Sequence, residues 1–298
     1  MRMVASMDGN QLAQPAACDG APFILTGPAP GAAPTPVIFA SPHSGRFYPP
    51  AMLAASLLGA HAIRRSEDAH VDQLILAAPD HGHALIVAEF ARAYLDVNRE
   101  PWELDPAMFE DELPSFARGR SARVAAGLGA IARIVCEGQE IYARKLTFAE
   151  AEGRVRAVHQ PYHAALEALI ARTRVRFGCA VLIDWHSMPA AAATASGDCD
   201  VVLGDRFGAA CAGGLTRFVE DQLAAMGYKV ARNAPYAGGF TTEHYGRPGR
   251  KVHALQIEIN RGLYLDEARL APNQGFERLR TDLGRLFAAM AGVDWARL

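Results

Sequence analysis

Two apolar segments of the chain each end abruptly near a histidine. Residues 179–183, C-A-V-L-I, show no polar alternation and run into D-W-H, which ends on His186. Residues 36–40, P-V-I-F-A, run in the same way into S-P-H-S-G, which contains His43. Continuous apolar runs of this length are typical of strands that are buried on both faces of a parallel sheet. Because ligands of such sheets bind at the carboxyl ends of the strands, the two histidines predict a site there.

The remaining apolar patterns predict an α/β fold around these two strands. Residues 105–176 have few strand signals, and we expect helices of this region to cover one face of the sheet. Residues 1–36, rich in Ala, Pro and Gly, predict an irregular lead-in, and 37–298 a single α/β hydrolase domain, since no linker divides them. Further strands are expected at 84–90, 200–206, 228–232 and 253–259, and helices at 50–58, 70–78, 148–174, 207–226 and 276–289.

The composition favours a small-molecule partner. The 30 basic and 32 acidic residues are scattered evenly and give a net charge of -2, which predicts neither nucleic-acid nor membrane binding. No signal-peptide core and no apolar run of about 20 residues occurs, so we expect a cytoplasmic protein. The cysteines form no C-x-x-C pair, which argues against a disulfide framework or a cysteine zinc site and favours a reducing compartment; they are Cys18, Cys136, Cys179, Cys199 and Cys211.

The two strand-end histidines, His43 and His186, predict a metal centre. A catalytic zinc ion is held by three protein ligands and keeps a fourth position open for water. The third ligand is expected to be Asp68 or Glu67, because S-E-D opens the predicted helix and a carboxylate there is readily fixed by local hydrogen bonds. Asp68 is preferred. The alternative for these two acids is a charge pair that is favoured only by the helix dipole.

Two arginines follow the predicted 84–90 strand and flank the sequence A-Y-L-D-V-N. The guanidinium groups of Arg92 and Arg99 could clamp a carboxylate bidentately or stabilise an oxyanion, and the alternative is a solvated surface pair. Asp96 lies between them, and its position favours a structural ion pair with either arginine. Spacing alone does not separate these possibilities.

Glu258 interrupts an otherwise apolar strand, L-Q-I-E-I. Burial of a carboxylate in such a strand is costly unless the group is paired or functional. Glu258 is therefore a candidate general base with a raised pKa, and an ion pair with Arg261 is the structural alternative.

In order, these motifs resemble the N-formylglutamate amidohydrolase family, a relative of the zinc carboxypeptidases and aspartoacylases. The resemblance covers residues 37–266 and rests on S-P-H-S-G, E-D-A-H-V-D, R-A-Y-L-D-V-N-R, D-W-H-S, N-x-P-Y-x-G-G-F and Q-I-E-I-N-R-G-L-Y-L-D. It implies a zinc-peptidase-like (phosphorylase/hydrolase-like) α/β fold, with a mixed twisted sheet between helices. It also implies hydrolysis of an amide next to an acidic amino acid.

The resemblance assigns roles to individual residues. His43 and His186 match zinc ligands, Asn98 and Arg99 match the pair that holds a substrate carboxylate, and Arg92 resembles the arginine that polarises the scissile carbonyl. Glu258 matches the general base of the family. The chain departs from the zinc carboxypeptidases at one position, where their glutamate three residues after the first histidine is replaced by Arg46, so the carboxylate ligand must come from elsewhere.

These assignments predict removal of a formyl or other small acyl group from an acidic amino acid, with N-formyl-L-glutamate giving formate and glutamate. Glu258 would move the proton, and Arg92 would stabilise the oxyanion. The carboxylate would be held by Asn98 and Arg99, or alternatively by Arg247 or Arg250. The rival hypotheses are a deacylase for another N-acyl amino acid or small peptide, and a non-catalytic protein that binds acidic amino-acid derivatives. A buried general base at Glu258 distinguishes an enzyme from a binding protein, because hydrolysis needs such a group and ligand binding does not.

Overall fold

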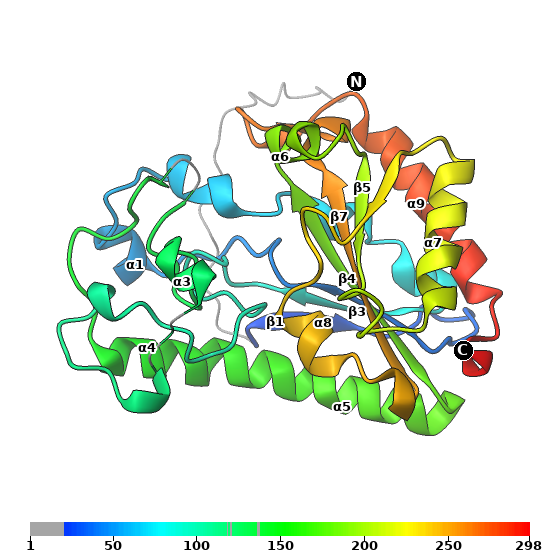
Figure 1. Ribbon diagram of the computed structural model, residues 1–298, viewed down its shortest axis with the longest axis horizontal. Helices are drawn as coiled ribbons and strands as arrows, with labels where there is room; N and C mark the ends of the chain where they lie inside the picture. Colours follow the sequence, from blue (N-terminus) through cyan, green and yellow to red (C-terminus); the bar gives the residue numbers. More distant parts are fainter. Residues whose placement is uncertain (1–20, 118, 120, 136–137) are drawn as a thin grey trace, which may run out of the picture.

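A seven-stranded mixed sheet organises the computed structural model, which describes residues 21–117, 119, 121–135 and 138–298 (Figure 1). The strand order is β1-β3-β2-β4-β7-β5-β6. Strands β3, β2, β4 and β7 are parallel, β1 is antiparallel to β3, and β5 is antiparallel to β7 but parallel to β6. The strands span Phe23–Thr26 (β1), Val37–Ser41 (β2), Ala84–Ala88 (β3), Ala180–Met188 (β4), Val201–Gly204 (β5), Val230–Arg232 (β6) and Val252–Asn260 (β7), and a small separate sheet pairs Leu265–Asp266 (β8) with Ala271–Pro272 (β9).

Each face of the sheet has its own hydrophobic core. Alternate side chains of a strand point to opposite faces, so Phe39 and Ile183 pack in one core while Ile38 and Leu182 pack in the other. Every residue of β2 and of β4 is buried. Burial on both faces is the reason why these two segments are continuously apolar, and it confirms the predicted α/β class with a mixed sheet between helices.

Helices cover the two cores from opposite sides. Helix α5 packs under one face, and α7 and α9 pack on the other, as Figure 1 shows. The predicted helix at 148–174 is present but is interrupted, because a π-helical turn over Val155–His159 joins α4 to α5. The helices span Pro50–Ala54 (α1), Val71–Leu74 (α2), Ala122–Ala125 (α3), Phe148–Arg154 (α4), Gln160–Phe177 (α5), Ala190–Ala195 (α6), Gly213–Ala225 (α7), Phe240–Tyr245 (α8) and Phe276–Ala291 (α9).

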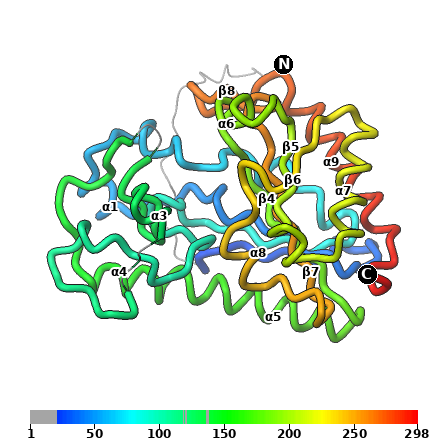
Figure 2. The backbone as a smooth tube through the Cα atoms, viewed as in Figure 1, coloured from blue at the N-terminus to red at the C-terminus, as the bar shows by residue number. Residues whose placement is uncertain are grey.

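The described residues between 105 and 147 differ from the prediction. They form turns, isolated bridges and short helical turns rather than a helical layer, and they follow an irregular path on the side of the molecule away from α7 and α9 (Figure 2). Met52 and Ile63 pack there with Val135 and Ile141 in a separate small core. This core holds the irregular segment against the loops that follow β2, and those loops carry part of the site described below.

The predicted irregular lead-in is wrong in part. Residues 23–26 form β1, which pairs antiparallel with β3 at the edge of the sheet, so the sheet begins before residue 37. Residues 1–20 lie outside the described part of the chain, as do Cys18 and Cys136. Within the described residues, Cys179, Cys199 and Cys211 are buried free thiols, and no helix is both long and apolar enough to cross a membrane.

Candidate functional site

The predicted histidines meet at the carboxyl ends of β2 and β4. His43 lies in the S-P-H-S-G loop directly after β2, and His186 lies near the end of β4, which continues beyond the apolar run to Met188. Gly45 allows this loop to approach the chain closely, because a Cβ at this position would lie 2.2 Å from the carbonyl oxygen of Phe90. The two imidazole ring centroids are 4.6 Å apart.

Three side-chain atoms of His43, Asp68 and His186 form a compact triangle. The Nδ1 atoms of the two histidines are 3.0 Å apart, Oδ2 of Asp68 lies 3.1 Å from Nδ1 of His186, and the same oxygen lies 3.4 Å from Nδ1 of His43. Tetrahedral zinc ligands at their usual bond lengths of 2.0 to 2.2 Å are separated by about 3.3 Å. The triangle therefore has the dimensions of one face of a zinc tetrahedron, and all three residues are buried.

The far side of each imidazole contacts a carboxylate. Nε2 of His43 lies 2.6 Å from Oδ1 of Asp96, and Nε2 of His186 lies 2.9 Å from Oδ2 of Asp184. An acceptor at Nε2 fixes the tautomer that leaves Nδ1 free to bind a metal. Burial alone lowers the pKa of His186, but the negative charges of Asp184 and the neighbouring acids raise it well above its usual range. The same negative surroundings favour a bound cation.

Asp68 is held by Arg261, whose expected alternative partner was Glu258. Nη2 of Arg261 donates to Oδ1 of Asp68 at 3.0 Å, and Oγ of Ser187 donates to the same oxygen at 3.2 Å. Oδ2 is thereby left to face the histidines. Burial raises the pKa of Asp68, but hydrogen bonds from the histidines and the charge of Arg261 outweigh burial and keep the pKa well below its usual range.

Glu67 and Arg46 point away from this triangle. Glu67 is fully buried, and its carboxylate accepts hydrogen bonds from Tyr48 Oη at 2.8 Å and Arg64 Nε at 3.0 Å. Arg46 forms an ion pair with Asp72. Of the two candidates for the third ligand, Asp68 is the one that joins the histidines.

Glu258 lies beside His186 in the sheet. The two residues are register partners on β7 and β4, and Nε2 of Gln256 donates to Oε1 of Glu258 at 2.7 Å. Burial is the largest cause that raises the pKa of Glu258, to about 7, and the negative charge of Asp68 adds to it, although the positive charges of His186, Arg92 and Arg261 oppose the change. A carboxylate with this pKa can accept and return a proton near neutral pH.

The residues predicted to bind substrate surround the same centre. Nη2 of Arg92 pairs with Oδ2 of Asp96 at 2.7 Å, and Nε of Arg99 lies 3.9 Å from the same oxygen, so this aspartate contacts both arginines as well as His43. Arg99 donates from Nη1 to the carbonyl oxygen of Asn98 at 2.9 Å and from Nε to that of Leu128 at 3.2 Å. Burial lowers the pKa of Arg99, and the nearby positive charges of Arg92 and Arg123 act in the same direction, while Asp96 opposes them.

Asn98 is largely committed to the protein. Its Oδ1 accepts from the N–H of Thr241 at 2.8 Å, and its Nδ2 donates to Oδ2 of Asp184 at 3.3 Å. Gly239 allows this approach, since a Cβ there would lie 2.6 Å from Nδ2 of Asn98. This contact accounts for the glycine-rich P-Y-A-G-G-F segment, and it leaves at most one N–H of Asn98 for a ligand.

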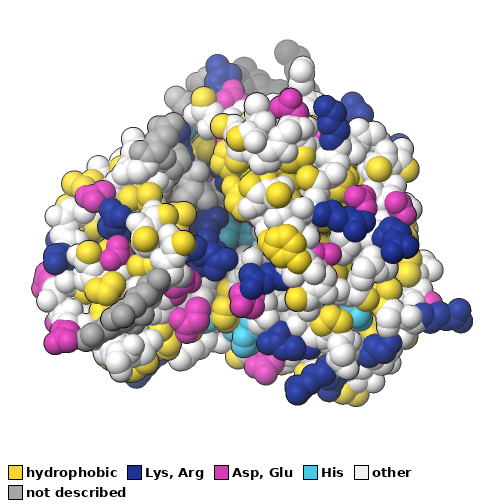
Figure 3. Space-filling model, viewed as in Figure 1, with side chains coloured by type: hydrophobic (Ala, Val, Ile, Leu, Met, Phe, Trp, Pro, Cys, Tyr) yellow, Lys and Arg dark blue, Asp and Glu magenta, His cyan; other side chains and the backbone are white. Residues whose placement is uncertain are grey.

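A cavity of about 660 Å³ opens onto these residues. Figure 3 shows it as a hollow with histidine at its base and Lys or Arg side chains around it. Arg247 and Arg250 are not among its described lining residues. Six arginines and three carboxylates line it: Arg65, Arg92, Arg99, Arg123, Arg206, Arg261, Asp68, Asp96 and Glu258.

Sequence reasoning missed several residues that shape the centre. Asp184 and Gln256 received no role, although each lies two positions before a predicted site residue and therefore on the same face of its strand. Arg261 was considered only as a partner for Glu258. Tyr236 also lines the cavity, and only its place in the glycine-rich segment pointed to it.

Comparison with known proteins places this chain in a family. The model of the N-formylglutamate amidohydrolase family matches residues 35–265. The chain belongs to this family. The matched segment contains every residue of the predicted site, from His43 to Glu258, and it also includes Arg261.

Two curated relatives and a solved structure agree with membership of the N-formylglutamate amidohydrolase family. N-formylglutamate deformylase from Pseudomonas aeruginosa is 28% identical over 78% of this chain and 83% of its own length, and the enzyme of the same name from Pseudomonas putida is 28% identical over 78% and 82%. The crystal structure of N-formylglutamate amidohydrolase from Ralstonia eutropha JMP134 has a TM-score of 0.85 and 38% identity, covering 91% of this chain and 97% of that one.

Proposed function

We propose that this chain is a zinc-dependent amidohydrolase that cleaves N-formyl-L-glutamate to formate and glutamate. The observation that carries the proposal is the triangle of His43, Asp68 and His186, with the buried carboxylate of Glu258 beside it in the sheet. The names of the relatives supply the substrate, and the arginine-rich cavity is consistent with an anionic one.

The donor set fits a catalytic zinc ion. Two imidazole nitrogens and one carboxylate oxygen are typical ligands of such a site, and acceptors behind the histidines together with Arg261 behind Asp68 would hold them in place. A zinc ion bound there would polarise the formyl carbonyl and make water a stronger acid.

Glu258 would transfer the proton in this reaction. Its carboxylate would accept a proton from the attacking water as the new C–O bond forms at the formyl carbon, and would return that proton to the amide nitrogen as the C–N bond breaks. Because Gln256 donates to Oε1, Oε2 remains available for this transfer. The positive charge of Arg92, held by Asp96, would stabilise the oxyanion that develops at the carbonyl oxygen.

Arg99 and the remaining N–H of Asn98 would bind a substrate carboxylate. Arg99 lies next to the metal-ligand region through Asn98, whose Nδ2 is 3.0 Å from Nε2 of His186. A carboxylate that is bound there lies close to the scissile amide, as the α-carboxylate of an N-formyl amino acid does. Arg99 is therefore assigned to the α-carboxylate.

A binding protein without activity is the alternative from another class. Such a protein would have no need of the buried carboxylate of Glu258 beside the ligand triangle, and this favours hydrolysis. A deacylase for another N-acyl amino acid shares all these features and is distinguished only by substrate.

Metal analysis combined with a substrate panel tests the proposal. We expect about one divalent ion per chain, release of formate from N-formyl-L-glutamate, loss of that release with a chelator and its recovery with zinc. Hydrolysis of N-acetyl but not N-formyl substrates would favour the other deacylase. Binding of N-formylglutamate without any formate would favour the binding protein.

A further inference from the structure

The cavity contains more positive charge than the predicted site uses. Four of its arginines form ion pairs with acids: Arg92 with Asp96, Arg261 with Asp68, Arg206 with Glu243 at 3.0 Å, and Arg99 with Asp96 at the longer distance of 3.9 Å. Arg99 is also held by two carbonyl oxygens.

Arg123 is a different case, because it lines the cavity without an ion pair. Within the described ranges of the chain, its side chain makes no hydrogen bond or ion pair with another residue. It lies on α3 and is neither fully buried nor freely exposed. A partly desolvated guanidinium without an anion is unfavourable, so this position suits a cation whose partner is a ligand.

The backbone fixes Arg123 next to Arg99. The carbonyl oxygen of Arg123 accepts from the N–H of Leu128 at 2.8 Å, and the carbonyl oxygen of Leu128 accepts from Nε of Arg99 at 3.2 Å. Leu128 thus connects the two arginines, and the positive charge of Arg123 contributes to the lowered pKa of Arg99. Two like charges that are held together in a cavity repel each other unless anionic groups lie between them.

The base of α3 is also well anchored. Oγ of Ser121 caps the helix by accepting from the N–H of Val124 at 3.2 Å, and Val124 is buried. Gly129 packs directly against Glu103, since a Cβ at Gly129 would lie 2.4 Å from the carbonyl oxygen of Glu103. Arg123 therefore lies on a part of the cavity lining that is held in place by packing and hydrogen bonds. A residue that determines specificity requires such a fixed position.

We propose that Arg123 binds the second, side-chain carboxylate of the substrate, while Arg99 binds the α-carboxylate. This assignment rests on the proposed function and deepens it. It restricts the preferred substrates to N-acyl amino acids with two carboxylates, because an uncharged side chain would leave the guanidinium of Arg123 without a partner. Arg99 contacts Asn98, which in turn contacts His186, whereas Arg123 is linked to Asn98 through Leu128 and Arg99. Arg123 therefore suits the carboxylate that is farther from the scissile amide.

The variant Arg123→Gln tests this assignment through substrate discrimination. N-formyl-L-glutamine has nearly the same shape as N-formyl-L-glutamate but lacks the second charge. The kcat/KM for the glutamate substrate should fall about 10- to 100-fold in the variant, as expected for a charge-assisted hydrogen bond, while that for the glutamine substrate stays within about threefold. Arg123→Lys should fall in between.

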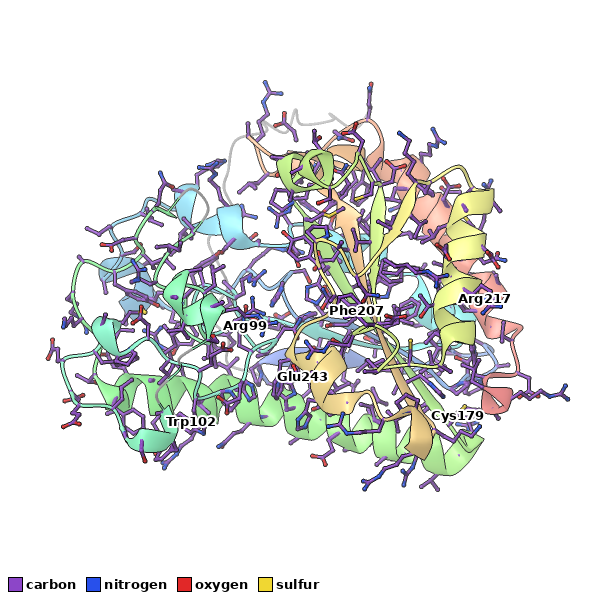
Figure 4. The ribbon with its side chains drawn as sticks, viewed as in Figure 1. Arg99, Trp102, Cys179, Phe207, Arg217 and Glu243 are labelled. Atoms are coloured by element: carbon purple, nitrogen blue, oxygen red, sulfur yellow. The ribbon has the colours of Figure 1, made fainter. Side chains whose placement is uncertain are left out.

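A matched control uses an arginine on the other side of the molecule. Arg217 lies on the exposed side of α7, far from Arg99 in Figure 4, and Arg217→Gln should leave both constants unchanged. Arg206→Gln is the competing variant, since Arg206 also lines the cavity. Loss of discrimination in Arg206→Gln and not in Arg123→Gln would overturn the assignment.

A binding measurement separates this assignment from the proposed reaction. Glutarate has the carboxylate spacing of glutamate, and butyrate lacks one of the two charges. Calorimetric titration should show glutarate binding weakened about tenfold or more by Arg123→Gln, with butyrate binding unchanged. If the wild type releases no formate but its glutarate binding depends on Arg123, only the proposed reaction is wrong. If the wild type is active and Arg123→Gln changes neither glutarate binding nor the kcat/KM for N-formyl-L-glutamate, only the assignment of Arg123 is wrong.

Discussion

His186 and Glu258 occupy directly paired positions on the parallel strands β4 and β7. Two residues earlier, Asp184 and Gln256 are paired in the same way, so the histidine, the carboxylate behind it, the candidate base and the amide that contacts the base share one face of the sheet. Strand register therefore sets the spacing between the ligand triangle and the base. A slip of one residue would turn Glu258 to the opposite face.

Substitution of the two neighbouring acids should separate metal binding from stability. Asp68→Ala is expected to remove most of the bound metal, because it deletes one corner of the ligand triangle. Glu67→Ala is expected to keep the metal but lower the free energy of unfolding by about 2 to 3 kcal/mol, since it leaves the buried Tyr48 and Arg64 groups without their acceptor. Metal content and urea denaturation check both, and the reverse pattern would reassign the third ligand to Glu67.

Asp184 should increase the affinity for the metal although it is not one of the metal ligands. Asp184→Asn removes the charge behind Nε2 of His186 and is expected to weaken zinc binding about 10- to 100-fold. Asp282→Asn is the control, because Asp282 is also a buried carboxylate but lies on α9 and accepts from Tyr228. Competition with a chromophoric chelator measures both affinities, and equal affinities in the two variants would contradict the orienting role.

The raised pKa of Glu258 predicts a stability effect in the metal-free protein. The folded-state pKa of about 7 lies above the ordinary value of 4.5, so the folded state binds the proton more tightly than the unfolded state does. The stabilisation from this proton is present below about pH 4.5 and is lost as the pH rises toward 7. Relative to Glu258→Gln, the wild-type free energy of unfolding should therefore fall by on the order of 2 to 3 kcal/mol between pH 5 and pH 8. A constant difference between the two proteins across this range would mean that the carboxyl group ionises normally.

Arg99→Lys should affect recognition of the α-carboxylate. Lysine keeps the charge but loses the planar fork that the carbonyl oxygens of Asn98 and Leu128 hold in place. The kcat/KM for N-formyl-glutamate and for N-formyl-glutamine should fall by similar factors of about 10 or more, whereas that for the α-amide of N-formyl-glutamate changes little. Arg247→Ala serves as the control, because Arg247 contacts backbone carbonyls outside the cavity. A loss confined to substrates with a side-chain carboxylate would move Arg99 to that role.

The central strands and the ligand histidines could be predicted because their signals are local. An apolar run that ends on a histidine identifies a buried strand and a strand-end side chain at the same time, as with His43 and His186. Glu258 was recognisable for the same reason, because a carboxylate within an apolar strand is unfavourable unless it has a role.

The contacts behind these residues depend on pairs that are distant in sequence. Arg261 reaches Asp68 across 193 positions, and no local pattern distinguishes that contact from an ion pair with Glu258, three residues away. Strand β1 was missed because it is a short edge strand, with three of its four residues exposed, and thus lacks a buried apolar run. The segment from 105 to 147 is rich in alanine and charge, as helices are, but its described residues include Val135 and Ile141, whose position is set by packing against residues that follow β2.

Turnover by Glu258→Gln tests the central claim most directly. Zinc content, affinity for N-formyl-L-glutamate and the rate of formate release are measured for wild type, for this variant and for Glu277→Gln, an exposed glutamate on α9. We predict that Glu258→Gln keeps about one zinc ion and wild-type affinity while formate release falls at least about a hundredfold, and that Glu277→Gln behaves as wild type. Formate release by Glu258→Gln at the wild-type rate would contradict the account.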